Sequence, residues 1–228
     1  SEAKVVRLNI QKAGSYIAYI KGAGDTVPES LRQIGYTVVT IKPEDISTEN
    51  LKKYDAVVMG IRAYNVIKEL QFKQKYLLNY VENGGNMIVQ YNTSRNVDVG
   101  APFSLTLSRD RVTDEFAEVR VLDKNHSLLN FPNKITDKDF EGWVQERGLY
   151  FPGTWSKEYT SILSMNDKNE IPKKGSLLIA KYGKGNYIYT GLSFFRELPA
   201  GVSGAYKLFA NMLSVGKDKI IINKEIKK

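Results

Sequence analysis

The stretch NGGNMIVQYNT, residues 83–93, contains a helix end, an apolar strand and a polar turn in that order. Asn83-Gly84-Gly85 is typical of a helix C-terminus. The run NMIVQY at 86–91 is apolar enough for a strand that is buried on both faces. DAVVMG, residues 55–60, is a second run of this kind, bounded by Asp and Gly. Such strands occur in parallel sheets that are covered by helices, so these two runs set the expected fold class.

Strand and helix patterns alternate before this stretch. SYIAYI at 15–20 and YTVVTI at 36–41 predict two further strands, with a capped helix over about 27–34 between them. The clearest helix is expected over 66–82, where apolar residues share one face. These residues are Ile67, Leu70, Leu77, Leu78 and Val81. The N-terminal part of the chain therefore predicts an α/β fold with a mostly parallel sheet.

Later patterns are less regular. FAEVRVL at 116–122 alternates and predicts an antiparallel or edge strand. Thr136 and Asp139 fit a capping box before a short helix. TSILSM and SLLIAKYGKGNYIYTGL predict three strands, of which the last two form a Gly-Lys-Gly hairpin. A final amphipathic helix is expected over 202–213.

The chain has 228 residues and 42% hydrophobic content, which suits one large domain. It starts abruptly at SEAKVV, so we expect a single domain over 1–228, cut from a longer protein, with a basic tail at 216–228. No run of 18 apolar residues exists, and no membrane span is expected. No signal-peptide pattern is present either. The compartment stays open, and a periplasmic signal would lie outside this chain.

Composition limits the possible partners and chemistry. The net charge is +8, but the tail holds five lysines against Asp218 and Glu225 and so supplies three of these charges. Without an Arg-rich stripe or a known motif, we do not expect nucleic-acid binding. The chain has no cysteine and one histidine, which excludes thiol nucleophiles, thiolate zinc sites and two-histidine metal sites. We expect no cofactor and no metal.

Ligands of open parallel sheets bind outside the carboxyl ends of the strands. The loops that follow the expected strands are rich in glycine, aromatic and hydrogen-bonding residues, so we expect a ligand site among them. The candidate ligand-binding residues are Arg62, Tyr64, Asn65, Tyr91, Asn92, His126, Trp143, Glu146, Arg147, Arg196 and Glu197.

Several candidates also have a structural interpretation. Arg62 could bind a carboxylate of a ligand, or it could brace Glu197 or Asp25. Tyr64 and Asn65 could contact a sugar hydroxyl, or they could close their own loop. Both interpretations stay open at this stage.

Three other motifs are weaker signals. GAGD, residues 22–25, is too short for the GxGxxG fingerprint, and a tight turn with a helix cap explains it. His126 lies in a turn and could act as a general base or as a structural residue. Ser94 is near a suitable turn, but no GxSxG elbow surrounds it. DKDFEGWVQERG at 137–148 has Gly where a calcium loop needs its last Glu, so a capped helix explains its acids better.

Four segments together resemble a known domain: DAVVMGIRAYN, VENGGNMIVQYNT, NHSLLNFPNKITDKDFEGWVQERGLYF and LLIAKYGKGNYIYTGLSFFRELPAGVSGAYKLFANML. They resemble the glutamine-amidotransferase-like (ThuA-like) domain found C-terminal to PIG-L/LmbE-type deacetylases of Bacteroidetes. The resemblance covers about residues 15–215, and GIRAYN, WVQERGLYF and GLSFFRELPAG are its more specific parts.

The resemblance implies a flavodoxin-like three-layer α/β sandwich related to class I glutamine amidotransferases, with a mostly parallel central sheet and a late antiparallel hairpin. Those enzymes keep a nucleophilic cysteine in the turn after a central strand. Here that turn begins at Tyr91-Asn92 and has no cysteine. The ThuA-like histidine after the hairpin is also missing, because the chain reads Gly-Leu-Ser-Phe at 191–194. The zinc motif of the deacetylase belongs to an upstream part of such proteins and is absent from this chain.

We therefore expect an accessory domain without a catalytic residue. Its partners would be the upstream deacetylase domain and an amino-sugar or glycan ligand, bound by aromatic, Arg and Asn side chains at the strand ends. A cryptic hydrolase with His126, or a carboxylate such as Glu146 or Glu197, as its base is one alternative. A docking or oligomerisation module is the other.

Overall fold

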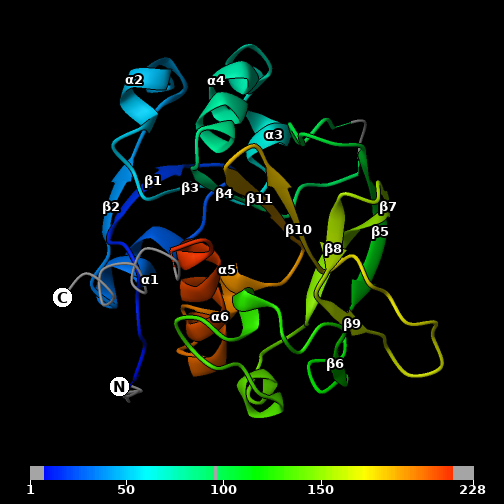
Figure 1. The fold of residues 1–228 in the computed structure, drawn as a ribbon. Helices are drawn as coiled ribbons and strands as arrows, with labels where there is room; N and C mark the ends of the chain where they lie inside the picture. Colours follow the sequence, from blue (N-terminus) through cyan, green and yellow to red (C-terminus); the bar gives the residue numbers. More distant parts are fainter. Residues whose placement is uncertain (1–7, 95–96, 218–228) are drawn as a thin grey trace.

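The computed structural model describes residues 8–94 and 97–217, and most of the expected basic tail at 216–228 lies outside them. Within this part the chain forms a seven-stranded sheet in the order β2-β1-β3-β4-β11-β10-β8 (Figure 1). The strands are β1 (Tyr16–Ile20), β2 (Thr37–Thr40), β3 (Ala56–Met59), β4 (Asn86–Gln90), β8 (Tyr159–Ser161), β10 (Leu177–Tyr182) and β11 (Gly185–Thr190). The strands from β2 to β11 in this order are parallel, and β10 pairs antiparallel with β11 and β8.

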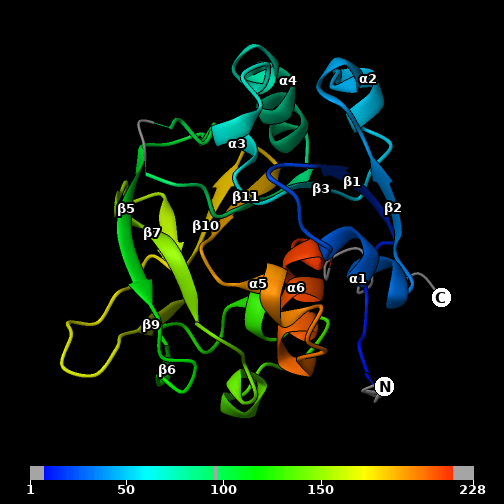
Figure 2. The same ribbon diagram turned by 180° about the vertical axis from the view of Figure 1, so that it is seen from behind.

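Helices cover both faces of this sheet (Figures 1 and 2). One face carries α2 (Thr48–Leu51), α3 (Ala63–Val66) and α4 (Leu70–Glu82), and the other carries α1 (Val27–Gln33), α5 (Phe194–Glu197) and α6 (Ser203–Ser214). Alternate residues of β3 enter the two cores, with Val58 on the α6 side and Val57 on the α4 side. Successive side chains of a strand point to opposite faces of the sheet, so a strand with a core on each face must be apolar at every position. The predicted three-layer α/β fold with a late antiparallel hairpin is confirmed.

Smaller antiparallel elements lie beside the β8 edge of the sheet. β5 (Leu105–Val112) pairs with β7 (Gly148–Trp155), and β6 (Val119–Val121) pairs with β9 (Leu163–Met165). Three 3₁₀ turns complete the described part: η1 (Pro43–Asp45), η2 (Ser127–Leu129) and η3 (Asp137–Phe140). The capping box at Thr136 and Asp139 is confirmed at the start of η3. None of the described helices is long and apolar enough to cross a membrane.

Two expectations about local structure were wrong, and one strand pair was missed. The helix expected over 66–82 is interrupted at Ile67, so that the short α3 and the longer α4 replace it. TSILSM is not one strand, because the chain leaves the main sheet at Ile162 and continues in β9 of another sheet. The β5–β7 pair was not predicted at all. Its pairing register shifts three times, which destroys the alternation that marks a regular strand.

A buried amide connects α6 to the irregular segment between β6 and η3. The Asn211 side chain donates to the carbonyls of Leu128 (2.9 Å) and Asn133 (2.7 Å). Its oxygen accepts the backbone N–H and the side-chain amide of Asn133 at 2.9 and 3.0 Å. Asn211 is completely buried, so water cannot replace these partners.

Replacement of this amide should destabilise the fold strongly. Asn211→Leu is expected to lower the free energy of unfolding by about 3 kcal/mol or more, because several buried backbone groups lose their partners. Urea denaturation followed by circular dichroism measures this change. Met212→Leu, at the buried position that follows, is the control and should cost less than about 1.5 kcal/mol. Equal losses in the two variants would contradict the role assigned to Asn211.

Candidate functional site at the strand ends

The carboxyl ends of β1, β3, β4 and β11 meet at one edge of the sheet because these strands are parallel. The first of the four loops is structural. The Asp25 carboxylate accepts the Tyr19 hydroxyl at 2.6 and 2.7 Å, and also the backbone N–H groups of Val27 (3.0 Å) and Ile61 (3.2 Å). A Cβ at Gly22 would lie 2.0 Å from the carbonyl oxygen of Ile61, so only glycine fits there. GAGD is therefore a tight turn, and its Asp25 accepts the first backbone N–H of α1.

Asn92 follows β4 directly and connects two of the loops at this edge of the sheet. Its oxygen accepts the Tyr64 N–H (3.0 Å), its amide donates to the Gln90 carbonyl (3.0 Å), and its own N–H donates to the Tyr189 hydroxyl (3.1 Å). The side chain is completely buried. Asn92 thus holds the turns after β3 and β4 together, and it is not exposed to a ligand.

Tyr64 and Asn65 belong to the same support. The Asn65 amide donates to the Thr93 carbonyl (3.3 Å), and the Asn65 oxygen accepts the Thr93 N–H (2.9 Å). The Tyr64 hydroxyl donates to the Gln74 oxygen at 2.9 Å. Of the two interpretations of these residues, the geometry favours loop closure over a contact with sugar.

A group of aromatic rings lies next to these supports. Tyr150 and Phe195 are partly exposed, whereas Tyr91 is only 8% exposed. The Tyr91 ring stacks on Tyr150, with centroids 6.2 Å apart and planes 10° apart, and it meets Phe195 at 5.2 Å and 45°. Tyr150 is the third residue of β7 and has a left-handed backbone (φ 52°), and Phe195 is the second residue of α5. We call Tyr91, Tyr150, Phe195, Arg62 and Arg196 the strand-end cluster.

The two arginines of the cluster differ in their partners. Arg196 donates to Glu146 (2.9 Å) and to Gln145, and its guanidinium lies 4.8 Å from the centroid of the Phe195 ring. The Arg62 side chain is exposed, and within the described residues it makes no hydrogen bond or ion pair. Arg62 thus braces neither Asp25 nor Glu197, and its charge is available to a ligand.

The pKa of the Tyr91 phenol depends on its burial and on the charges around it. Burial raises the pKa of Tyr91, whereas the nearby charges of Arg62 and Arg196 oppose this rise. Arg62 is fixed close to the ring from the backbone, because its N–H donates to the Tyr91 carbonyl at 2.8 Å. Of the predicted residues, the structure therefore brings Arg62, Tyr91, Glu146 and Arg196 together.

Three other predicted residues lie inside the protein, next to the cluster. Trp143 packs against Phe140 and Phe194 and donates its ring N–H to the Asp139 carbonyl at 3.1 Å. The Arg147 guanidinium donates to the Ala117 carbonyl at 3.1 and 2.8 Å and also to the Phe140 carbonyl. These two side chains are 2% and 5% exposed, so they do not contact a ligand in this conformation.

Glu197 is the third internal residue. One carboxylate oxygen accepts the Val144 N–H at 3.0 Å, and the other is buried without a partner in the described part of the chain. Burial raises the pKa of Glu197 to about 7, although the Val144 hydrogen bond and the Arg147 charge oppose this.

His126 lies away from the other candidates. Its Nδ1 accepts the Leu128 N–H at 3.2 Å at the start of η2, which packs on α6, and burial lowers its pKa. Tyr150 and Phe195 are not among the candidate ligand-binding residues, although the sequence already places them in aromatic segments near the strand ends. The aromatic composition of GLYFPGTW and SFFRE was visible, but which rings face outward depends on the irregular start of β7.

No protein-family model and no curated protein matches this sequence. Solved structures match its fold. A protein described as a GMP synthase subunit, from Thermoplasma acidophilum, has a TM-score of 0.58 at 13% identity, over 94% of this chain and 100% of that chain. A ThuA-like protein from Bacteroides uniformis has a TM-score of 0.52 at 15% identity, over 93% and 96%. A β-galactosidase from Rahnella sp. R3 has a TM-score of 0.51 at 14% identity, over 86% of this chain but 30% of that chain.

These matches show the fold. The chain has the three-layer α/β architecture of ThuA-like and amidotransferase-like proteins, as the sequence resemblance implied. At such low identities, the matches carry no information on the ligand or on chemistry.

The buried Glu197 should make stability depend on pH. Its pKa is raised in the folded state, so the folded protein binds its proton more tightly than the unfolded chain does. The stabilisation is complete below pH 4.5 and is lost as the pH rises through about 7. Glu197→Gln should remove this loss, which amounts to at most about 3 kcal/mol. Urea denaturation of both proteins across this pH range measures the difference, and parallel curves would contradict the raised pKa.

Proposed function

We propose that this chain is a non-catalytic, ligand-binding domain that holds a carbohydrate at the strand-end cluster. The observation that carries the proposal is the partly exposed ring of Tyr150, stacked on the buried Tyr91, beside the guanidinium of Arg62, which has no partner among the described residues. The site lies where ligands of open α/β sheets bind.

Sugars suit this combination of side chains. A pyranose ring presents CH groups on its faces, which pack on aromatic rings, and hydroxyl groups at its rim, which accept hydrogen bonds from arginine. Arg62 can also bind the acetamide oxygen or a carboxylate of a substituted sugar. An amino sugar or a glycan that contains one is therefore the ligand that we propose.

The proposed wider role is that of an accessory domain in a larger PIG-L-type deacetylase. Under this proposal the strand-end cluster presents the amino-sugar polymer, and an upstream domain removes the acetyl groups. The lack of any cysteine in the chain supports a binding role, because the amidotransferase reaction needs this thiol. This chain matches 30% of the length of the β-galactosidase chain, so a domain with this fold can form one part of a longer enzyme.

A hydrolase is the second candidate function, and the raised pKa of Glu197 favours it. A carboxyl group with a pKa of about 7 can exchange a proton at neutral pH. However, Glu197 is completely buried, and the other predicted bases, Glu146 and His126, are already engaged by Arg196 and Leu128. Activity above background on a panel of ester, amide and glycoside substrates that Glu197→Gln abolishes would establish the hydrolase instead.

Titration of chitobiose and its deacetylated form, followed by NMR or calorimetry, tests the binding proposal. We expect millimolar or tighter affinity, with shifts of the amide signals around Tyr91 and Tyr150. Tyr150→Ala and Arg62→Ala should each weaken binding about tenfold, since each removes about 1.4 kcal/mol of contact energy. Arg109→Ala removes an exposed arginine on β5 and is the matched control, with no expected change.

Two results would contradict the proposal. One is the absence of binding at millimolar sugar together with no effect of Arg62→Ala. The other is equal affinity in all three variants, which would place the sugar elsewhere. Pull-down of this chain with the proposed deacetylase domain tests the docking alternative, which predicts a stable complex whether or not sugar is present.

A further inference from the structure

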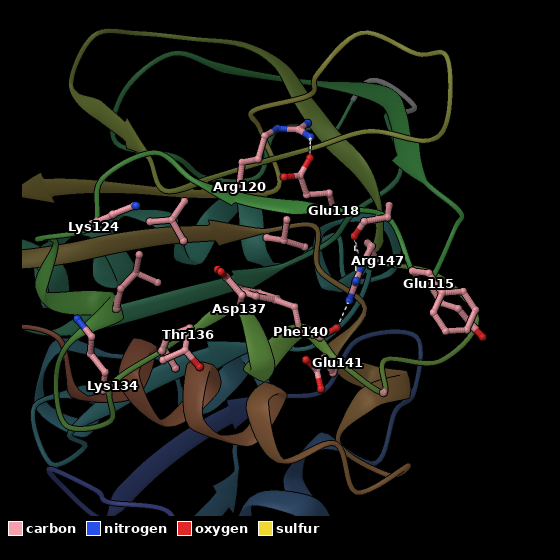
Figure 3. A pocket seen from close by; sticks show the side chains of 17 residues that line it. Glu115, Glu118, Arg120, Lys124, Lys134, Thr136, Asp137, Phe140, Glu141 and Arg147 are labelled. Atoms are coloured by element: carbon pink, nitrogen blue, oxygen red, sulfur yellow. Dashed lines mark hydrogen bonds and ion pairs between the residues drawn. The ribbon is translucent and has the colours of Figure 1, made fainter.

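A cavity in the described part of the chain lies away from the strand-end cluster. Its volume is about 820 Å³, within the range of ligand-binding pockets. The segment 115–121, which includes β6, forms one wall, and residues 134–137 and 140–142 around η3 form another (Figure 3). Every residue from Glu115 to Val121 lines this cavity. If one face of the strand bordered it, only alternate residues would do so. The edge of the β6 segment therefore runs along the cavity.

This edge has unpaired backbone groups. Val119 is opposite Met165 in the β6–β9 ladder, and the N–H and C=O of Met165 bond instead to Lys173. Leu122 donates its N–H to Ile162, so the hydrogen-bonded positions of β6 are the even-numbered ones. In an antiparallel pair the N–H and C=O groups of the intervening residues face the other side. Those of Val119 and Val121 thus face away from β9, and no described residue bonds to them.

Arg147 closes one end of the same edge. The Ala117 carbonyl is the next group in this row, and it accepts two hydrogen bonds from the Arg147 guanidinium. The guanidinium also bonds to the Phe140 carbonyl, so it spans the two walls (Figure 3). The unpaired part of the edge begins beyond this closed end, at Val119.

The cavity has an apolar floor and oppositely charged ends. Leu129, Ile135 and Phe140 contribute buried apolar surface, and Phe116 is 81% exposed at the rim. Glu115 and Glu141 lie toward the end that Arg147 closes (Figure 3). Lys124 and Lys134 lie at the opposite end (Figure 3). None of these four charged side chains forms an ion pair with a described residue.

We propose that this cavity binds an extended peptide, which adds a strand to the free edge of β6. The peptide backbone pairs with Val119 and Val121, and its alternate apolar side chains enter the floor. A basic side chain of the peptide lies near Glu115 and Glu141, and a carboxylate lies near Lys124 and Lys134. Two unpaired N–H and C=O pairs at strand spacing match another peptide backbone better than they match a compact small molecule. The charged ends set the direction of the bound strand.

A displayed library of random octapeptides, selected against the whole chain, tests this inference. The enriched peptides should alternate β-branched or aromatic residues with polar ones, and should carry Lys or Arg at one end and Asp or Glu at the other. Saturation with the best peptide should slow amide hydrogen exchange at Val119 and Val121 at least tenfold, as measured by NMR.

Two variants separate the peptide site from the fold. Val121→Pro removes an outward N–H and leaves the positions that bond to β9, so it should abolish binding. If Val121→Pro fails to fold, Glu141→Lys is the second variant and should weaken peptide binding at least fivefold. Glu44→Lys is its control, because it reverses an exposed charge far from the cavity in the sequence, and it should leave peptide binding unchanged. Slow exchange at Val119 without peptide, which grows with protein concentration, would identify a second copy of the chain as the occupant and overturn the proposal. No enrichment, or binding that leaves these two amides unprotected, would also overturn it.

Discussion

The buried guanidinium of Arg147 is the interaction on which both candidate sites depend. It is 5% exposed and gives hydrogen bonds to the Ala117 and Phe140 carbonyls, which belong to segments well separated in the sequence. A buried charge is tolerated only when its donors are satisfied. The Arg147 backbone also bonds to Val112 and Ser193, which ties the start of β7 to the loop after β11. Arg147 therefore positions one end of the cavity beside β6, the aromatic rings of β7 and the start of α5.

Under the proposed function, the strand-end cluster binds a ligand although the chain has no cysteine in the turn after β4, where the resemblance to amidotransferases would place one. The turn after β4 has the expected place at the carboxyl edge of the sheet, but Asn92 fills it with structural hydrogen bonds to Tyr64, Gln90 and Tyr189. The surface above this turn consists of aromatic rings and of Arg62, whose side chain has no partner in the described part of the chain. Such a surface provides contact area and hydrogen-bond donors, which are the groups that the proposed binding role needs.

Much of the fold could be predicted because its central strands are buried on both faces. The runs DAVVMG and NMIVQY have this property, and β3 and β4 lie within one residue of the expected limits. The site was harder to predict. Arg62 and Tyr91 could be predicted because they lie at the ends of predicted strands. Contacts with distant segments bury Trp143, Arg147 and Glu197, and no local sequence pattern reveals such contacts. The cavity beside β6 could not be predicted either. The free edge of β6 depends on its pairing register with β9, which is a distant segment of the chain.

A crystal structure of the chain with chitobiose bound would test the central claim most directly. We predict that one sugar ring packs on Tyr150, beside Tyr91, and that Arg62 lies within hydrogen-bond distance of a hydroxyl or acetamide oxygen. Sugar bound in the groove beside β6, or an empty strand-end cluster at saturating sugar, would contradict the claim that this surface is the ligand site.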